Sequence, residues 1–307
     1  MTVDSETWSP SDTEIIARAV IEAPSVHDTQ PWNLTLPGSA AELEERLEFA
    51  EPGADPLRPD RLISCGTAVA HLELAMRVLG RQVRTDLCPF PDRPAVIARI
   101  ETLRSSVPDS SDLRLYAAIS RRKSHRDAFA DIPVPAETIG DVVAAGAQVP
   151  DVGIRLLASD EAQALADMLT YSAEAKRRNP HYQREMFSWT SHWQPEGNAE
   201  VVEDWDATLD EHGAAGKAMI TTEVPETSAL AAAIDRETVL LFNAASADPI
   251  DLVRIGMATE RAWLAAVDAR LSASVLTHPL RIEDSAERLR ARLGMATPPQ
   301  LIMRIGY

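Results

Sequence analysis

The chain has 307 residues, a formal net charge of −17, 45% hydrophobic and 25% charged residues. These proportions are those of an ordinary globular protein, and the negative charge excludes general binding to a nucleic-acid backbone. Its two cysteines fit a reducing compartment, no His/Cys spacing suggests a metal site, and no apolar run approaches the ~20 residues that span a bilayer. We therefore expect a cytoplasmic protein without metal, membrane or nucleic-acid partners.

The first residues predict no signal peptide, because they carry Asp4 and Glu6 and lack a basic segment followed by an apolar one. A first helix is predicted over residues 11–22, where Ser11 is an N-cap candidate and apolar residues recur at helical spacing. The chain is therefore expected to enter its first helix shortly after the N-terminus.

The loop that follows reads APSVHDTQPW over residues 23–32. Its two prolines fix a rigid, irregular path, and the residues between them are dense in hydrogen-bonding groups. An ordinary helix-exit loop has a similar composition, since Ser, Asp and Pro all favour turns. Composition alone therefore leaves a structural turn and a binding loop open.

A weak internal repeat appears farther along the chain. Residues 66–79 predict a helix that ends at Gly80, and residues 256–270 can be laid over it. Strands are predicted after the two helices, over residues 82–87 and 272–276, and elsewhere over residues 151–158 and 301–305. The matched pairs are Gly66 with Gly256, Ala68 with Ala258, Leu74 with Leu264 and Ala75 with Ala265. Helices rich in Ala and Leu match easily by chance, so the repeat alone does not establish a duplication.

A basic cluster spans Arg122 to Arg126 in this acidic chain. Arginine presents paired donors to phosphate, and each charge-assisted hydrogen bond contributes roughly 1.5–3 kcal/mol. The alternative is a solvated basic helix face. Farther on, residues 176–226 are polar and acidic but hold Trp189, Trp193 and Trp205, which favour a packed lid over disorder.

Two of these segments resemble FMN-dependent nitroreductases. The loop is similar to the family's APSxxNxQPW signature, and RKSHRDAF, which begins at Arg122, looks like its RRSxRxF segment. The resemblance implies an α+β nitroreductase-like fold. It also implies FMN contacts from Pro24, Ser25, Val26, His27, Asp28, Gln30, Arg122, Lys123, Ser124 and Arg126. Asp28 departs from the family's Asn and replaces a donor and acceptor by an acceptor when ionised.

A third segment, Thr277-His278-Pro279, resembles the family's turn that presents backbone N–H groups to the flavin N5 edge. A lone His beside a proline is more typical of a turn than of catalysis, so no catalytic side chain is predicted. Flavin chemistry needs few side chains, because the protein mainly orients and tunes the ring.

The order of the two motifs is reversed relative to ordinary nitroreductases, in which two chains interlock and the basic segment comes first. With the C-terminal PQLIMRIGY, this order resembles the Acg-type branch of fused pseudo-dimers. We accordingly predict two nitroreductase-like halves, residues 1–110 and 111–307, each contributing part of one FMN site. The second half would contain the lid insertion at about 176–226, and the chain would be a monomer.

The resemblance implies an NAD(P)H-dependent reductase of nitro compounds or quinones, with hydride transfer through flavin N5 and an oxidant that the sequence does not identify. A second hypothesis is a flavin-sequestering or storage protein whose lid tryptophans block substrate. A third is a cofactor-free interaction protein that has kept only the scaffold. The sequence leaves these alternatives open.

Overall fold

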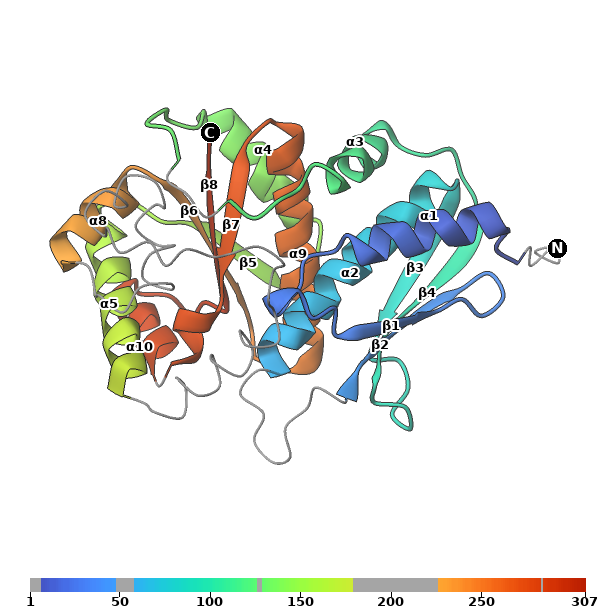
Figure 1. Ribbon diagram of the computed structural model, residues 1–307, viewed down its shortest axis with the longest axis horizontal. Helices are drawn as coiled ribbons and strands as arrows, with labels where there is room; N and C mark the ends of the chain where they lie inside the picture. The colour runs from blue at the N-terminus through green and yellow to red at the C-terminus, as the bar shows by residue number, and fades with distance from the viewer. Residues whose placement is uncertain (1–6, 48–57, 126–128, 179–225, 283) are drawn as a thin grey trace, which may run out of the picture. The chain divides into compact units, whose positions relative to one another are not determined.

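The computed structural model describes residues 7–47, 58–125, 129–178, 226–282 and 284–307 (Figure 1). Its helices and strands are interspersed along the chain, which confirms the predicted α+β class. The contacts divide the chain into two compact units. Unit 1 comprises residues 1–123, 135–154 and 242–271, and unit 2 comprises residues 124–134, 155–241 and 272–307.

Unit 1 contains an antiparallel sheet with the strand order β1-β2-β4-β3. Its strands are β1 (Trp32–Thr35), β2 (Ala41–Glu45), β3 (Arg81–Leu87) and β4 (Val96–Ser105). A turn with Gly38 at φ +63° joins β1 to β2, and only glycine adopts this backbone region without strain. In β2 and β4, Leu43 pairs with Ala98 and both are fully buried, so the central strands face the core of this unit.

The helices of unit 1 are α1 (Pro10–Ile21), α2 (Arg58–Val78), α3 (Ser110–Ile119), α4 (Ala136–Gly146) and α9 (Pro249–Asp268), with the short 3-10 helix η1 (Val26–Asp28) after α1. A capping box between Ser9 and Asp12 begins α1. The apolar stripe of α1 faces inward, since Ile16, Ala19 and Val20 are buried. The second helix ends just before Gly80, as predicted, and Gly80 has φ +77°.

The long helices α2 and α9 lie side by side in the core of unit 1 (Figure 1). They meet at two glycines through a reciprocal contact. A Cβ on Gly66 would lie 2.1 Å from the Val253 carbonyl oxygen, and a Cβ on Gly256 would lie 2.0 Å from that of Ile63. Any side chain at either position would force the helices apart. In addition, α1 packs on α2 and α4 packs on α9.

A second sheet has the order β5-β6-β8-β7, with β7 and β8 antiparallel. Its strands are β5 (Val152–Leu156), β6 (Thr238–Ala244), β7 (Ser272–Leu276) and β8 (Leu301–Gly306). All six residues of β8 are buried, as expected for an inner strand. The strands at 152–156, 272–276 and 301–306 agree with those predicted from the sequence.

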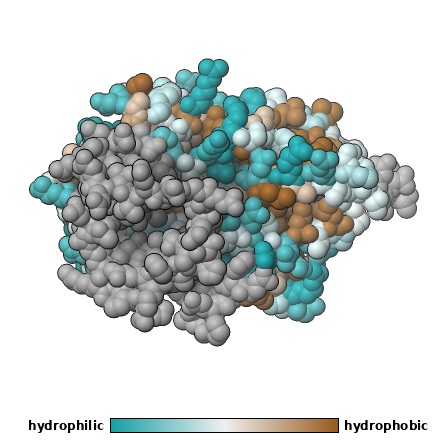
Figure 2. All heavy atoms as spheres, in the orientation of Figure 1, coloured by the Kyte–Doolittle hydropathy of each residue, from teal (hydrophilic) through white to brown (hydrophobic). Residues whose placement is uncertain are grey.

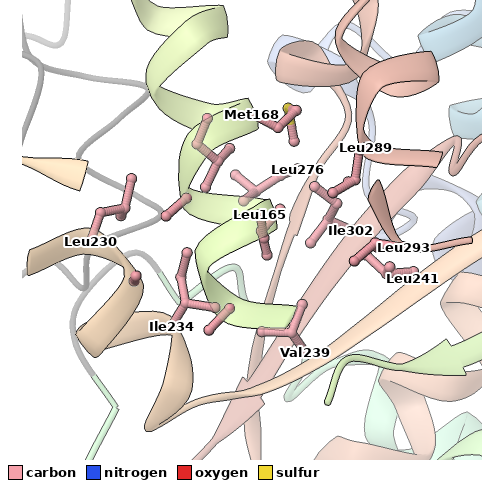
Figure 3. Close-up of a cluster of buried hydrophobic side chains, with 14 of the residues drawn as sticks. Leu165, Met168, Leu230, Ile234, Val239, Leu241, Leu276, Leu289, Leu293 and Ile302 are labelled. Carbon is pink, nitrogen blue, oxygen red and sulfur yellow. The ribbon is translucent and has the colours of Figure 1, made fainter. Parts of the chain in front are cut away.

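The core of unit 2 is built by helices that bury leucines against this sheet. These helices are α5 (Ala162–Arg178), α8 (Thr227–Asp235) and α10 (Ser285–Arg292), with 3-10 helices η3 (Ser159–Glu161) and η4 (His278–Arg281). Figure 3 shows side chains of α5, such as Leu165, directed toward Leu276 and Ile302 of the strands. Unit 2 therefore has a hydrophobic cluster of its own.

On the face drawn in Figure 2, hydrophilic and hydrophobic residues of the described chain are interspersed. None of the described helices is both long enough and apolar enough to cross a membrane. Residues 179–225, which hold most of the predicted lid insertion, lie outside the described residues.

Candidate functional site

The loop after α1 is attached to α2 by hydrogen bonds rather than by regular structure. The Val26 N–H donates to Ser64 Oγ at 3.0 Å. The Thr67 hydroxyl donates to the Pro24 carbonyl at 2.7 Å. Ser64 and Thr67 are buried and lie one turn apart on α2, so the helix holds both sides of the loop. The loop is therefore held in a fixed conformation, as its two prolines predict.

The same loop is also held from within, and its backbone is unusual. The Gln30 N–H donates to Ser25 Oγ at 2.9 Å, and the Gln30 side chain donates to the Ile21 carbonyl at 2.9 Å. Asp28 and Gln30 have φ of +57° and +46°, in the left-handed region that side chains disfavour. Such a conformation persists where its surroundings impose it, and it is frequent at ligand sites. Asp28 is exposed, and His27 lies within η1.

Arg122, predicted to bind phosphate, is directed toward three groups within unit 1. Its Nη2 donates to the Glu22 carbonyl at 3.3 Å, at the C-cap of α1. Its Nε lies 3.5 Å from Glu260 Oε1, and its guanidinium lies 4.8 Å from the ring centroid of Trp263. The side chain is only 12% exposed, whereas the neighbouring Lys123 is exposed.

Sequence reasoning missed two residues, His71 and Glu260, that form a buried pair beside Arg122. His71 Nε2 lies 2.7 Å from Glu260 Oε1, and His71 Nδ1 lies 2.7 Å from the Ala19 carbonyl oxygen. Both side chains are 0% exposed. Their one signal in the sequence is an ionisable residue within a helix that is mostly buried. That signal does not name the partner.

In unit 2, the chain after Lys123 runs beside β7. Ser124 forms a parallel bridge with Ala273, and the His125 N–H donates to the Ala273 carbonyl at 2.8 Å. The His125 ring stacks on Phe129 with centroids 4.9 Å apart. Ser124 itself is exposed, so a fixed backbone presents its hydroxyl to solvent.

The turn predicted to face the flavin edge is the start of η4. The Leu280 N–H donates to the Thr277 carbonyl at 2.9 Å, and Pro279 is buried while Thr277 and His278 are half-buried. This places a compact turn directly after β7. Arg126 and the lid residues Trp189, Trp193 and Trp205 lie outside the described residues.

Metal binding and thiol chemistry are the two further possibilities that the residue types raise. Within the described parts of the chain, no cluster of His, Cys, Asp and Glu could hold a metal ion. Cys65 and Cys88 are free thiols. Burial, with the nearby Glu45 carboxylate, raises the pKa of Cys65 well above its usual range, and burial also raises the pKa of Cys88. A raised pKa disfavours the nucleophilic thiolate.

Comparison with known proteins identifies related sequences over most of the chain. A family model described as "Nitroreductase family" matches residues 119–307. Two Mycobacterium tuberculosis (strain H37Rv) proteins, named "Putative NAD(P)H nitroreductase Rv3131" and "Putative NAD(P)H nitroreductase acg", are 26% and 25% identical to this chain. The alignments cover 94% and 96% of this chain and 82% and 89% of those proteins.

Among solved structures, an FMN-dependent nitroreductase, NfnB from Mycobacterium smegmatis in complex with NADPH, is similar with 17% identity and a TM-score of 0.41. The alignment covers 64% of this chain and 87% of that chain.

Proposed function

Because this chain belongs to the nitroreductase family, we propose that it is a flavoprotein that binds one FMN and reduces small molecules with NAD(P)H. The observation that carries the proposal is the family match over residues 119–307, which includes the basic segment. The rigid loop at residues 23–32, with the sequence signature of the same family, supports it from the other part of the chain.

The donor set of the basic segment fits a phosphate. Lys123 offers an ammonium group and Ser124 a hydroxyl, and both side chains are exposed. We assign the phosphate to Lys123, Ser124 and Arg126, since the guanidinium of Arg122 already contacts Glu22 and Glu260. The remaining contacts proposed for FMN come from the loop and the turn, namely Pro24, Ser25, Val26, His27, Asp28, Gln30, Thr277, His278 and Pro279.

Bound FMN would supply reversible hydride transfer between the nicotinamide and the oxidant. The residues of this chain would bind and orient it. The loop would border the ring from a fixed position because α2 holds Pro24 and Val26. The turn at Thr277 would present backbone N–H groups to the flavin N5 edge, as the family resemblance implies. No side chain is assigned a proton-transfer role, and the oxidant is proposed only as a nitro compound or quinone.

We further propose that the chain is an intramolecular pseudo-dimer, with halves 1–110 and 111–307, and that it is a monomer. The reciprocal contact of Gly66 and Gly256 supports a local two-fold relation between α2 and α9. The pairing of α1 with α2 and of α4 with α9 supports the same relation. Sedimentation of the purified chain would test the monomer, and a stable dimer would contradict it.

The experiment that tests the function is anaerobic mixing of the yellow protein with NADPH. We expect FMN to bind in a 1:1 ratio and its visible absorbance to bleach on mixing, with recovery when a nitroaromatic or quinone is added. Protein that binds FMN but is bleached only by dithionite would overturn the reductase and identify a flavin-sequestering protein. Protein that binds no FMN would overturn the whole proposal.

A further inference from the structure

The strongest unassigned feature is the buried cluster formed by His71, Glu260 and Arg122 in unit 1. Glu260 is 0% exposed in α9, and its Oε1 faces both His71 Nε2 and Arg122 Nε, at 2.7 and 3.5 Å. A buried carboxyl group is costly unless it is paired. Glu260 Oε1 therefore pairs with both His71 and Arg122, while Arg122 Nε and Glu260 Oε2 have no hydrogen-bond partner among the described residues.

The protons of the cluster can be counted. The Ala19 carbonyl only accepts, so His71 Nδ1 must carry a hydrogen. The 2.7 Å contact between His71 Nε2 and Glu260 holds one more proton, on either atom. In both arrangements the pair has no net charge. The positive charge of Arg122 also lies near two favourable dipoles, the carbonyl of Glu22 at the negative end of α1 and the face of Trp263.

These contacts tie together segments that carry the proposed flavin ligands. Arg122 immediately precedes Lys123, and its Nη2 is bound to Glu22, directly before the loop that begins at Ala23. His71 holds the same end of α1 through Ala19. One buried carboxyl group thus fixes where the loop starts relative to Lys123.

We propose that Arg122 is a positioning residue, held by the His71–Glu260 pair, that sets the loop at residues 23–30 for flavin binding without contacting the flavin phosphate. The proposal rests on the proposed FMN site. It assigns to Arg122 a role different from that of Lys123, although both belong to one basic segment.

Riboflavin separates the two roles, because it lacks only the phosphate of FMN. We expect Arg122→Ala to weaken FMN and riboflavin binding by the same factor, about tenfold. Lys123→Ala should weaken FMN alone. Arg121→Ala is the matched control, since Arg121 is exposed and lies 3.7 Å from Asp268, and it should change neither dissociation constant by more than about twofold. Loss of FMN affinity in Arg122→Ala with unchanged riboflavin affinity would overturn the proposal.

Variants of Glu260 test whether the cluster acts as a unit. Glu260→Leu removes both polar contacts and should reproduce the loss seen in Arg122→Ala for both ligands. Glu260→Gln keeps an acceptor for Arg122 and the shape of the side chain, and it should retain affinity within about threefold. If Glu260→Leu binds flavin as the unchanged protein does, the link from Glu260 to the loop is refuted.

Hydrogen exchange on flavin-free protein gives a readout independent of binding. Arg122→Ala and Glu260→Leu should accelerate exchange at residues 23–30, including the Val26 and Gln30 amides, while strands β3 and β4 keep their protection. Unchanged exchange in the loop would overturn the positioning role. If the unchanged chain binds neither flavin, the proposed function fails, and exchange still decides whether Arg122 positions the loop.

Discussion

The segment after α1 and the segment after α4 are held by corresponding positions of α2 and α9, but with different chemistry. When Gly66 is laid over Gly256, Ser64 falls on Arg254 and His71 falls on Arg261. Ser64 and His71 contact the end of α1 and its loop. From the corresponding positions of α9, the two arginines contact the segment after α4.

In the second of these segments, Arg254 pairs with Asp151 at 3.1 Å, and Arg261 donates to Gln148. Asp151 has φ +62°, so a left-handed residue occurs here too, next to a charged anchor. A serine and a histidine hold the end of α1 and the loop that follows it. Long charged groups bind the second segment directly. Anchoring side chains therefore occur at corresponding positions of α2 and α9, whereas the loop sequence proposed for cofactor binding follows α1 and not α4.

The largest effect is expected from substitutions at Gly66 and Gly256, where α2 and α9 are in contact. Gly66→Ala and Gly256→Ala should each lower the free energy of unfolding by about 3 kcal/mol or more, because the added Cβ would meet a backbone carbonyl that cannot move alone. Urea denaturation followed by circular dichroism measures the loss. Similar losses for the two variants would sharpen the comparison, and a loss in only one would break the reciprocity.

Gly140→Ala is the matched control for these variants. Gly140 is exposed within α4, and an added Cβ there would have no heavy atom within 4 Å. We expect this variant to be more stable by about 0.5–1 kcal/mol, since alanine loses less conformational freedom in a helix.

Helix ends and strands were predictable because their signals are local, whereas buried charges were not. The first helix was expected over residues 11–22 and spans Pro10–Ile21. The helix predicted to begin at Gly66 begins at Arg58 instead. Its first turns carry charged residues that interrupt the apolar pattern, and the partner of buried Arg61 is Glu45, at 3.2 Å. A sequence shows the charge but not the residue that neutralises it.

The site illustrates the same difference. The family resemblance was confirmed by the match over residues 119–307, which includes the basic segment. The fixed loop followed from its prolines. The contact between Arg122 and Glu260 could not be predicted. A run of basic residues has the same sequence pattern whether its side chains face solvent or a buried carboxyl group. The assignment of flavin ligands stays a prediction.

Loss of the Ser64 side chain, which holds the loop after α1, should have an intermediate effect. Ser64→Ala leaves the Val26 N–H without its acceptor, and we expect it to reduce the free energy of unfolding by about 1–2 kcal/mol. Affinity for FMN should fall as well, because the loop loses its attachment to α2. Ser106→Ala, at an exposed serine, should change stability by less than about 0.5 kcal/mol. If Ser64→Ala lowers stability but leaves FMN affinity intact, the loop at 23–30 does not need this anchor for binding.

Loss of the Arg254 side chain, which holds the segment after α4, should have a smaller effect on stability and on FMN affinity. The side chains of Arg254 and Asp151 are 28% and 65% exposed, so their ion pair is screened by water. Arg254→Ala should therefore reduce stability by at most about 1 kcal/mol and leave FMN affinity unchanged. Titration with FMN and urea denaturation check both statements. A fall in FMN affinity comparable to that of Ser64→Ala would show that the second segment also serves the cofactor, which would break the contrast between the two segments.

The smallest effect is expected at the position where Cys65 of α2 falls on Ile255 of α9, and both are 0% exposed. An aliphatic counterpart suggests that the thiol acts as a packing group. Burial raises the pKa of Cys65, so the thiolate fraction is reduced at every pH below that pKa. We expect iodoacetamide at pH 8 to label Cys65 only when the helix opens, and half-buried Cys88 to react first. Mass spectrometry of timed samples distinguishes the two sites. Labelling of Cys65 as fast as Cys88 in the folded protein would mean that α2 opens locally, and a helix that opens could not hold the loop through Ser64 and Thr67.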